Sequence, residues 1–256
     1  IILLLALIGS CLSAKGYATR YWDCCKPSCS WPDHAGDYKT RMCDKEGKNI
    51  ISFEEDMWAK SACDPGGYAT TCLTQQPWAV SETLAYGFAA TPGGSNCCGK
   101  CYQLTFTGTG NWENSENNAR LKGKKMIVMA TNIGYDVAGG QFDVMIPGGG
   151  VGVFNGCASI FSGDMGEQYG GLLSVCEKEI SADAGDKDGY QKRKDCLAKK
   201  CQQVFQGEAL KGCMFHVEWL EAAGNPSLEY EEVPCPEELK LGFVVTQTSL
   251  ETSARA

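Results

Sequence analysis

The sequence predicts an all-β domain, closed or sandwiched, whose long loops are tied by disulfide bonds. Segments in which polar and apolar residues alternate are short, glycine-rich loops separate them, and few stretches have helical spacing. The 256 residues include 16 cysteines and 31 glycines. So many cysteines are typical of a disulfide framework that forms in an oxidising compartment. Disulfide-tied loops over such a sheet would leave a groove for an extended ligand.

The first 14 residues have the pattern of a secretory signal peptide that lacks its usual start. An apolar run over residues 1–8 is followed by small residues up to Ala14. We therefore expect residues 1–14 to be a signal peptide remnant, the protein to be secreted, and residues 15–256 to form a single domain. Loss of Cys11 would leave 16 − 1 = 15 cysteines, so one thiol would stay unpaired.

Charge and composition disfavour several classes of partner. The net charge of −8 argues against nucleic acid and anionic membranes, and it is compatible with a neutral polymer. Two histidines and the lack of a repeated CxxC spacing predict no metal site. The glycine-rich turn at residues 147–152 lacks the Lys-Ser/Thr of a nucleotide-binding loop. We expect a monomer without a cofactor.

The expected elements follow from local patterns taken in chain order. Alternation or short apolar runs predict strands at residues 19–23, 102–106, 125–130, 141–146, 215–220, 228–233 and 243–248. A short helix or turn is expected within residues 53–62, and a second short helix over residues 82–90 with Ser81 as its N-cap. Residues 177–211 are charged, with helical spacing in residues 190–205. We interpret them as a surface insertion held by Cys196 and Cys201.

The stretch around Asp23 is the first candidate site. Period-two alternation places Thr19, Tyr21 and Asp23 on one face of a strand, which is unusual for a core but suits the wall of a cleft. Asp143, on the strand at residues 141–146, makes the best partner for Asp23 in carboxylate chemistry, and Asp136 lies in the loop before it. The alternative is an edge strand whose Asp23 caps a turn, together with a surface carboxylate at residue 143.

Several motifs in one order resemble the family 45 glycoside hydrolases, which are small secreted endo-β-1,4-glucanases. The matching segments are residues 19–31 (TRYWDCCKPSCSW), 76–80 (QPWAV), 87–91 (GFAAT), 101–107 (CYQLTFT), 123–126 (GKKM), 142–152 (FDVMIPGGGVG) and 225–227 (NPS). The resemblance spans about residues 17–239, apart from the charged insertion.

This resemblance implies a six-stranded double-psi β-barrel with a long substrate groove and few short helices. It also implies one catalytic domain that hydrolyses internal β-1,4-glucosidic bonds of cellulose and related β-glucans with inversion. By motif, Asp23 would be the general base, Asp143 the general acid and Asp136 an assisting carboxylate. Side chains that would line or stack on glucose subsites are Thr19, Tyr21, Trp31 and Tyr169.

The reaction requires different protonation states of the two main carboxyl groups. Burial or a negative neighbour such as Asp136 should raise the pKa of Asp143, which must donate a proton. Polar neighbours such as Thr19 and Tyr21 should keep Asp23 ionised. The chain departs from the family pattern at two positions. Gln141 stands where the family often has His, and Asn155 where it often has Asp. We expect these departures to alter the pH optimum or the rate, while both main carboxylates remain in place.

The resemblance also implies a disulfide pattern. The implied pairs are Cys24–Cys157, Cys25–Cys63, Cys29–Cys97, Cys43–Cys72, Cys101–Cys235 and Cys176–Cys213. Cys98 would lack a partner, and Cys196 with Cys201 would be free to pair within the insertion. Two other classes compete with the hydrolase: an expansin-like protein that binds or loosens glucan without hydrolysis, and a barwin-type defence protein. Asp23 argues against the first, and the chain length and the acid pair argue against the second.

Overall fold

The computed structural model describes residues 13–34, 39–112, 114–181, 189–241 and 244–245. The expected signal peptide at residues 1–14 and the strand at residues 243–248 therefore fall almost wholly outside the described residues. Within the described part of the chain, no helix has the length and apolar character that a membrane crossing needs.

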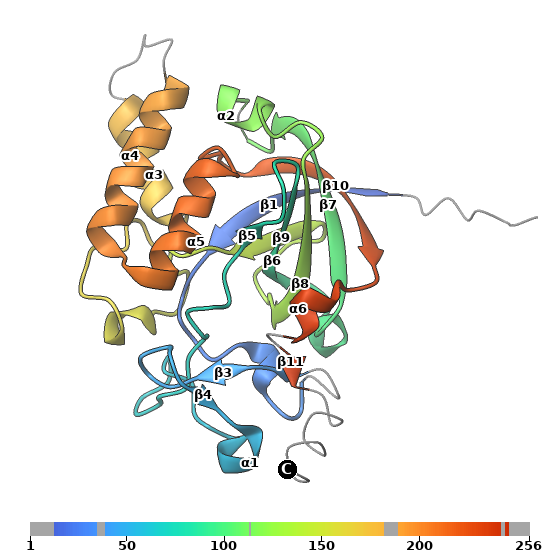
Figure 1. Ribbon diagram of the computed structural model, residues 1–256, viewed down its shortest axis with the longest axis vertical. Coiled ribbons are helices and arrows are strands. Elements are labelled where there is room, and N and C mark those ends of the chain that lie inside the picture. Colours follow the sequence, from blue (N-terminus) through green and yellow to red (C-terminus); the bar gives the residue numbers. More distant parts are fainter. Residues whose placement is uncertain (1–12, 35–38, 113, 182–188, 242–243, 246–256) are drawn as a thin grey trace, which may run out of the picture.

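The fold consists mostly of strands, with a group of helices on one flank (Figure 1). The strands are β1 (Ala14–Tyr21), β2 (Lys39–Thr40), β3 (Met42–Cys43), β4 (Ile50–Ile51), β5 (Trp78–Ala79), β6 (Leu84–Thr91), β7 (Cys101–Gly110), β8 (Lys125–Ile133), β9 (Gln141–Met145), β10 (Pro226–Val233) and β11 (Val244–Val245). The helices are α1 (Phe53–Asp56), α2 (Glu116–Ala119), α3 (Gly171–Ser181), α4 (Gly189–Val204), α5 (Gly207–Glu218) and α6 (Glu237–Leu241).

Six strands of the main sheet form a closed ring, with β5 paired to it from outside. The strands of the sheet follow the order β5-β6-β8-β7-β10-β1-β9, and a further pairing connects β6 with β9. The pairs β1–β9 and β6–β8 are parallel, and the others are antiparallel. Each of the six strands β6, β8, β7, β10, β1 and β9 therefore has a neighbour on both sides, which leaves no open edge among these six strands. The buried core includes Leu104, Phe106, Met126, Phe142 and Val144.

The strands expected at residues 102–106, 125–130, 141–146 and 228–233 are confirmed as parts of β7, β8, β9 and β10. The helix expected over residues 82–90 is wrong, because this segment is strand β6. The Ser81 hydroxyl does accept hydrogen bonds from the backbone N–H groups of Thr83 and Leu84, as an N-cap would. These bonds close the turn between β5 and β6 instead, and pairing with β8 overrides the helical spacing.

The strand expected at residues 215–220 is also wrong. Most of this segment belongs to helix α5, whose buried face includes Ala209, Gly212, Cys213 and His216 at helical spacing. The five-residue alternation that predicted a strand is too short to distinguish the two periods. By contrast, the helical spacing in residues 190–205 is confirmed by α4.

Helices α3, α4 and α5 pack side by side on one flank of the sheet (Figure 1). They share a buried cluster that includes Leu173, Leu197, Phe205 and Val217. Much of residues 177–211 therefore contributes to a core of its own rather than only to the surface.

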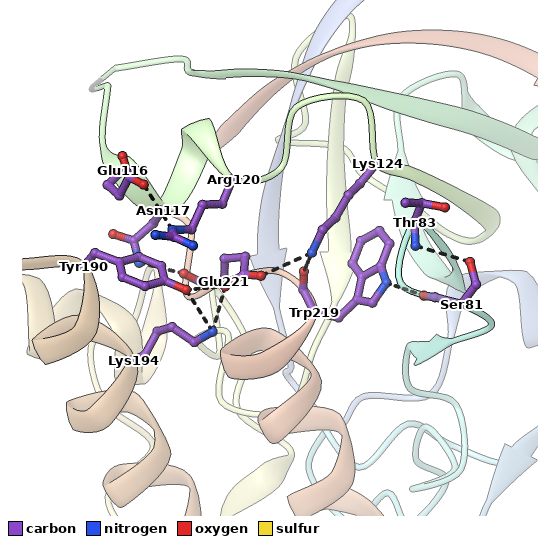
Figure 2. Close-up of polar contacts among 10 residues, drawn as sticks. All are labelled: Ser81, Thr83, Glu116, Asn117, Arg120, Lys124, Tyr190, Lys194, Trp219 and Glu221. Carbon is purple, nitrogen blue, oxygen red and sulfur yellow. Dashed lines mark hydrogen bonds and ion pairs between the residues drawn. The ribbon is translucent and has the colours of Figure 1, made fainter.

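A polar corner ties this helical layer to the loop before β10 (Figure 2). Lys194 and Lys124 form ion pairs of 2.7 Å and 3.3 Å with the Glu221 carboxylate, and the Tyr190 hydroxyl donates to it at 2.7 Å. The Asn117 side chain of α2 donates to the Glu221 carbonyl at 2.6 Å. The corner thus connects α2, α4 and the residue before β8 through Glu221.

Four of the six expected disulfides are present in the structure, namely Cys24–Cys157, Cys25–Cys63, Cys43–Cys72 and Cys101–Cys235. The expected Cys29–Cys97 pair is wrong, because Cys29 pairs with Cys98. Among the cysteines that the structure describes, Cys97 is the buried free thiol, instead of Cys98. The three sulfur atoms lie within 4.8 Å of one another, so the order of residues along the chain does not decide between the two neighbours.

The expected Cys176–Cys213 pair is wrong as well. Cys176 of α3 pairs with Cys196 of α4, and Cys201 of α4 pairs with Cys213 of α5. Cys196 and Cys201 are five residues apart in one continuous helix, so they point in different directions and cannot pair with each other. Each instead faces the adjacent helix, and the two bridges hold the three helices together.

Candidate active site

The two candidate carboxylates are carried by neighbouring parallel strands. In the β1–β9 pairing Thr19 lies beside Asp143, so Asp143 is placed within the middle of the ring of strands. Asp23 follows β1 by two residues, where Cys24 adopts a left-handed backbone with φ 58°. The disulfides of Cys24 and Cys25 anchor the chain directly after Asp23.

Two chambers meet at Asp143. The first chamber, of about 570 Å³, contains Asp23 and Trp31. The second chamber, of about 330 Å³, contains Trp112 and Tyr169. Asp143, Asp136 and Tyr21 line both chambers, whereas Asp23 lines only the first. Together the chambers form the groove in which an extended ligand would pass the carboxylates.

A larger cavity, of about 990 Å³, lies between β5 and α5 and is separate from this groove. Its charged side chains include Lys124, Lys211, Glu208 and Glu221, and these form ion pairs with one another. Neither Asp23 nor Asp143 lines this cavity, so it is not the candidate site.

Asp143 has the electrostatics of a proton donor. Its pKa is raised to about 7, chiefly by burial and also by the charges of Asp136 and Asp23, whereas a hydrogen bond from the Thr19 side chain and the charge of Arg20 oppose the rise. Its Oδ1 atom is buried and has no hydrogen-bond partner among the described residues. An unpaired oxygen of this kind is costly to bury as a carboxylate, which favours the protonated form.

Asp23 differs from Asp143 in one respect that favours its ionised form. Its pKa is raised to about 6, chiefly by burial and also by nearby Asp136, whereas the Cys25 backbone N–H donates to Oδ1 at 2.9 Å and opposes the rise. The backbone donor at Cys25, rather than the expected Thr19 or Tyr21, is what stabilises the charge. Asp136 is exposed on the loop between β8 and β9, from which its charge reaches both of the other carboxyl groups.

The sequence of this chain also matches the model of a known protein family. The family model described as Glycosyl hydrolase family 45 matches residues 15–195. The chain belongs to glycosyl hydrolase family 45. Among curated proteins, Endoglucanase B of Cellvibrio japonicus is 46% identical over 233 residues, which cover 88% of this chain and 44% of that protein. The Endoglucanase of Cryptopygus antarcticus is 37% identical over 242 residues, which cover 91% of this chain and 89% of that protein.

The crystal structure of a cellulase from the Antarctic springtail Cryptopygus antarcticus has a similar fold over most of this chain. The TM-score is 0.70 at 34% identity, covering 93% of this chain and 99% of that chain. This chain spans only about half the length of two other curated relatives, 44% of the Cellvibrio japonicus protein and 55% of a putative endoglucanase type K of Fusarium oxysporum.

In this family 45 protein, Gln141 belongs to a series of hydrogen bonds that ends at Asp143. The Tyr17 hydroxyl and the Ala138 N–H both donate to Gln141 Oε1, at 2.9 Å and 3.0 Å. The Gln141 Nε2 group then donates to Thr19 Oγ1 at 2.9 Å. The Thr19 side chain is in turn hydrogen-bonded to the Asp143 carboxyl group, where it lowers the pKa. This series of hydrogen bonds thus links Gln141 to Asp143.

Asn155, the second departure from the family pattern, is exposed and accepts a hydrogen bond from the Ala158 N–H at 3.2 Å. It does not line either chamber. In this structure its side chain stabilises a local turn.

The aromatic residues that sequence reasoning selected lie at different depths. Tyr21 is 9% exposed, and its hydroxyl accepts a hydrogen bond from the Asn132 side chain, so it lines the groove from within the wall. Trp31 is half-buried in the first chamber, with the Lys26 ammonium 3.6 Å from its ring centroid. Tyr169 is 63% exposed at the second chamber.

Two site residues were missed by sequence reasoning. Asn132 joins Tyr21 to the Ser28 backbone, because its Oδ1 accepts from the Ser28 N–H at 2.7 Å. Trp112 lines the second chamber from the loop after β7. The only signal for Trp112 was an indole in a polar loop, and nothing in the sequence placed that loop beside Asp143.

Proposed function

We propose that the protein is a secreted endoglucanase that hydrolyses internal β-1,4-glucosidic bonds of cellulose and related β-glucans by a single displacement with inversion. Asp23 acts as the general base and Asp143 as the general acid. The observation that carries this proposal is the arrangement of the two carboxyl groups. Both line one chamber as half-buried side chains, and among the described residues only Asp23 accepts a backbone N–H, whereas Asp143 has a buried Oδ1 without a partner.

In the proposed reaction, ionised Asp23 takes a proton from a water molecule. The water oxygen attacks the anomeric carbon from the side of Asp23 as the glucosidic bond breaks. The leaving oxygen takes the proton of Asp143, so one proton is gained at Asp23 and one is lost at Asp143. Asp136 assists through its charge, which raises the pKa of Asp143 and keeps the proton available for the leaving group.

The same proposal covers the expected architecture and surroundings. We infer that the ring of six strands is a double-psi β-barrel and that residues 15–256 form a single catalytic domain, with 177–211 inserted away from the groove. The enzyme acts as a monomer without metal or cofactor. Thr19 and Tyr21 form the groove wall at the cleavage point, and Trp31 and Tyr169 contact glucosyl units on either side.

The test follows the anomeric configuration of the products by proton NMR as the oxidised protein acts on a soluble cello-oligosaccharide. The expected initial product is the α-anomer, together with loss of cleavage in Asp143→Asn and Asp23→Asn variants that keep the wild-type circular dichroism spectrum. An initial β-anomer would indicate a covalent intermediate and would overturn the role given to Asp23. No cleavage of any β-glucan would favour the non-hydrolytic, expansin-like alternative.

A further inference from the structure

The two chambers correspond to two sides of the scissile bond, if the function proposed above is accepted. The sugar that is attacked must lie between Asp23 and Asp143, because water approaches it from Asp23 and the leaving oxygen faces Asp143. Only the first chamber contains both residues. The second chamber contains Asp143 without Asp23, so it receives the leaving group.

Trp112 has the properties of a binding surface in that second chamber. Its side chain is 67% exposed although it lines the chamber wall. A single exposed aromatic residue is common on protein surfaces and carries no argument alone. Here the indole is also held in place, because the ring of Tyr17 packs edge-on against it with centroids 5.5 Å apart. Tyr17 is in turn fixed by its hydrogen bond to Gln141.

The loop that carries Trp112 is anchored on both sides. Before the indole, the Asn111 N–H donates to the Asn225 carbonyl at 2.9 Å, and Asn225 lines the same chamber. After it, the Asn117 and Asn118 side chains donate to the carbonyl groups of Glu221 and Gly224. Figure 2 shows Asn117 beside the Glu221 corner that ties α2 to the helical layer. A pre-positioned aromatic ring loses little conformational entropy when it binds a ligand.

We propose that Trp112 is a binding platform for a glucosyl unit on the leaving-group side of the cleavage point. The flat face of a β-linked glucose ring presents C–H groups that pack on an indole, and its hydroxyl groups remain free for the polar groups of the chamber. Trp112 packs on Tyr17, which precedes Thr19 by two positions on β1, and we therefore place Trp112 against the unit that follows the one at Asp143. It therefore binds only chains long enough to extend past that first unit.

The experiment uses cellohexaose labelled with ¹⁸O at its reducing end, with cleavage positions read by mass spectrometry. Trp112→Ala should lower kcat/KM for cellohexaose about tenfold, as for loss of an anchoring tryptophan. It should also move cleavage toward the reducing end, since fewer units are then held on the leaving-group side. Trp112→Phe, which keeps a flat ring, should retain most of the wild-type pattern. Tyr68→Ala, which removes an exposed ring that lines neither chamber, is the matched control and should behave as wild type.

Two results would overturn the inference while the wild-type enzyme remains active. One is an unchanged cleavage pattern in Trp112→Ala. The other is an equal loss of kcat/KM for cellohexaose and for the shortest oligosaccharide that the enzyme cleaves, which would indicate general damage to the site. A wild-type protein that cleaves no cellohexaose would instead overturn the proposed function, and this inference with it.

Discussion

Replacing Thr19 with valine tests the hydrogen bond that controls the proposed acid. The Thr19 hydroxyl lowers the pKa of Asp143, but the larger effect of burial outweighs it, and the overall pKa is raised to about 7. A hydrogen bond to a charged group contributes about 1.5–3 kcal/mol, and one pKa unit corresponds to about 1.4 kcal/mol. Thr19→Val, which has nearly the same shape, should therefore raise the pKa of Asp143 by at least about one unit.

The assay is the pH dependence of kcat/KM on a soluble cello-oligosaccharide. Activity requires protonated Asp143, so it is lost as pH rises through the pKa of that group. The alkaline limb should lie near pH 7 in the wild type and near pH 8 in Thr19→Val, within about one unit. Thr19→Ser keeps the hydroxyl and should leave the limb in place. An alkaline limb that does not move in Thr19→Val, or that moves to lower pH, would refute the reasoning.

Two further predictions concern stability. The raised pKa of Asp143 means that the folded protein binds this proton more tightly than the unfolded chain, so the free energy of unfolding falls as pH rises from about 4 to about 7. Asp143→Asn should therefore gain Tm relative to wild type across this range in calorimetry, and a variant that loses stability by pH 8 would contradict this. At Glu221, burial raises the pKa, but hydrogen bonds from Lys194 and Tyr190 outweigh burial and lower the pKa overall. The stabilising contribution of ionised Glu221 is therefore present above about pH 4.3, and it is lost as pH falls through the folded-state pKa. In urea unfolding, Glu221→Gln should lower the free energy of unfolding by about 1–3 kcal/mol at pH 7 and by much less near pH 3. The control is Glu116→Gln, at an exposed ion pair with Arg120, which should change the free energy of unfolding by less than about 1 kcal/mol.

The carboxylates could be predicted from sequence because their positions depend on strands with clear patterns. Residues 141–146 alternate cleanly, and the structure has β9 there with Asp143 beside Thr19. The stabilising donor for Asp23 could not be predicted. It is the backbone N–H of Cys25, which points at the carboxylate only because Cys24 adopts a left-handed conformation. A side-chain pattern contains no information about such a backbone turn.

The errors in the fold have the same origin, since local patterns were overridden by contacts distant in sequence. Residues 82–90 have helical spacing, yet parallel pairing with β8 makes them a strand. The cysteine partners of the helical layer depend on which helices are adjacent, and that order follows from the packing of α3, α4 and α5. The choice between Cys97 and Cys98 depends on distances among three sulfur atoms that lie within 4.8 Å of one another.

The order of the two carboxyl pKa values is what makes the proposed reaction workable. Burial alone would raise the pKa of both Asp23 and Asp143, and equal values would leave the proton on either group. The backbone donor at Cys25 acts on Asp23, whereas the buried Oδ1 of Asp143 has no partner among the described residues. The pKa of Asp23 therefore stays near 6 and that of Asp143 near 7, so the form with an ionised base and a protonated acid is the favoured one between these values. Asp136 raises both pKa values, so its removal should shift both limbs of the pH profile downward rather than exchange the two roles.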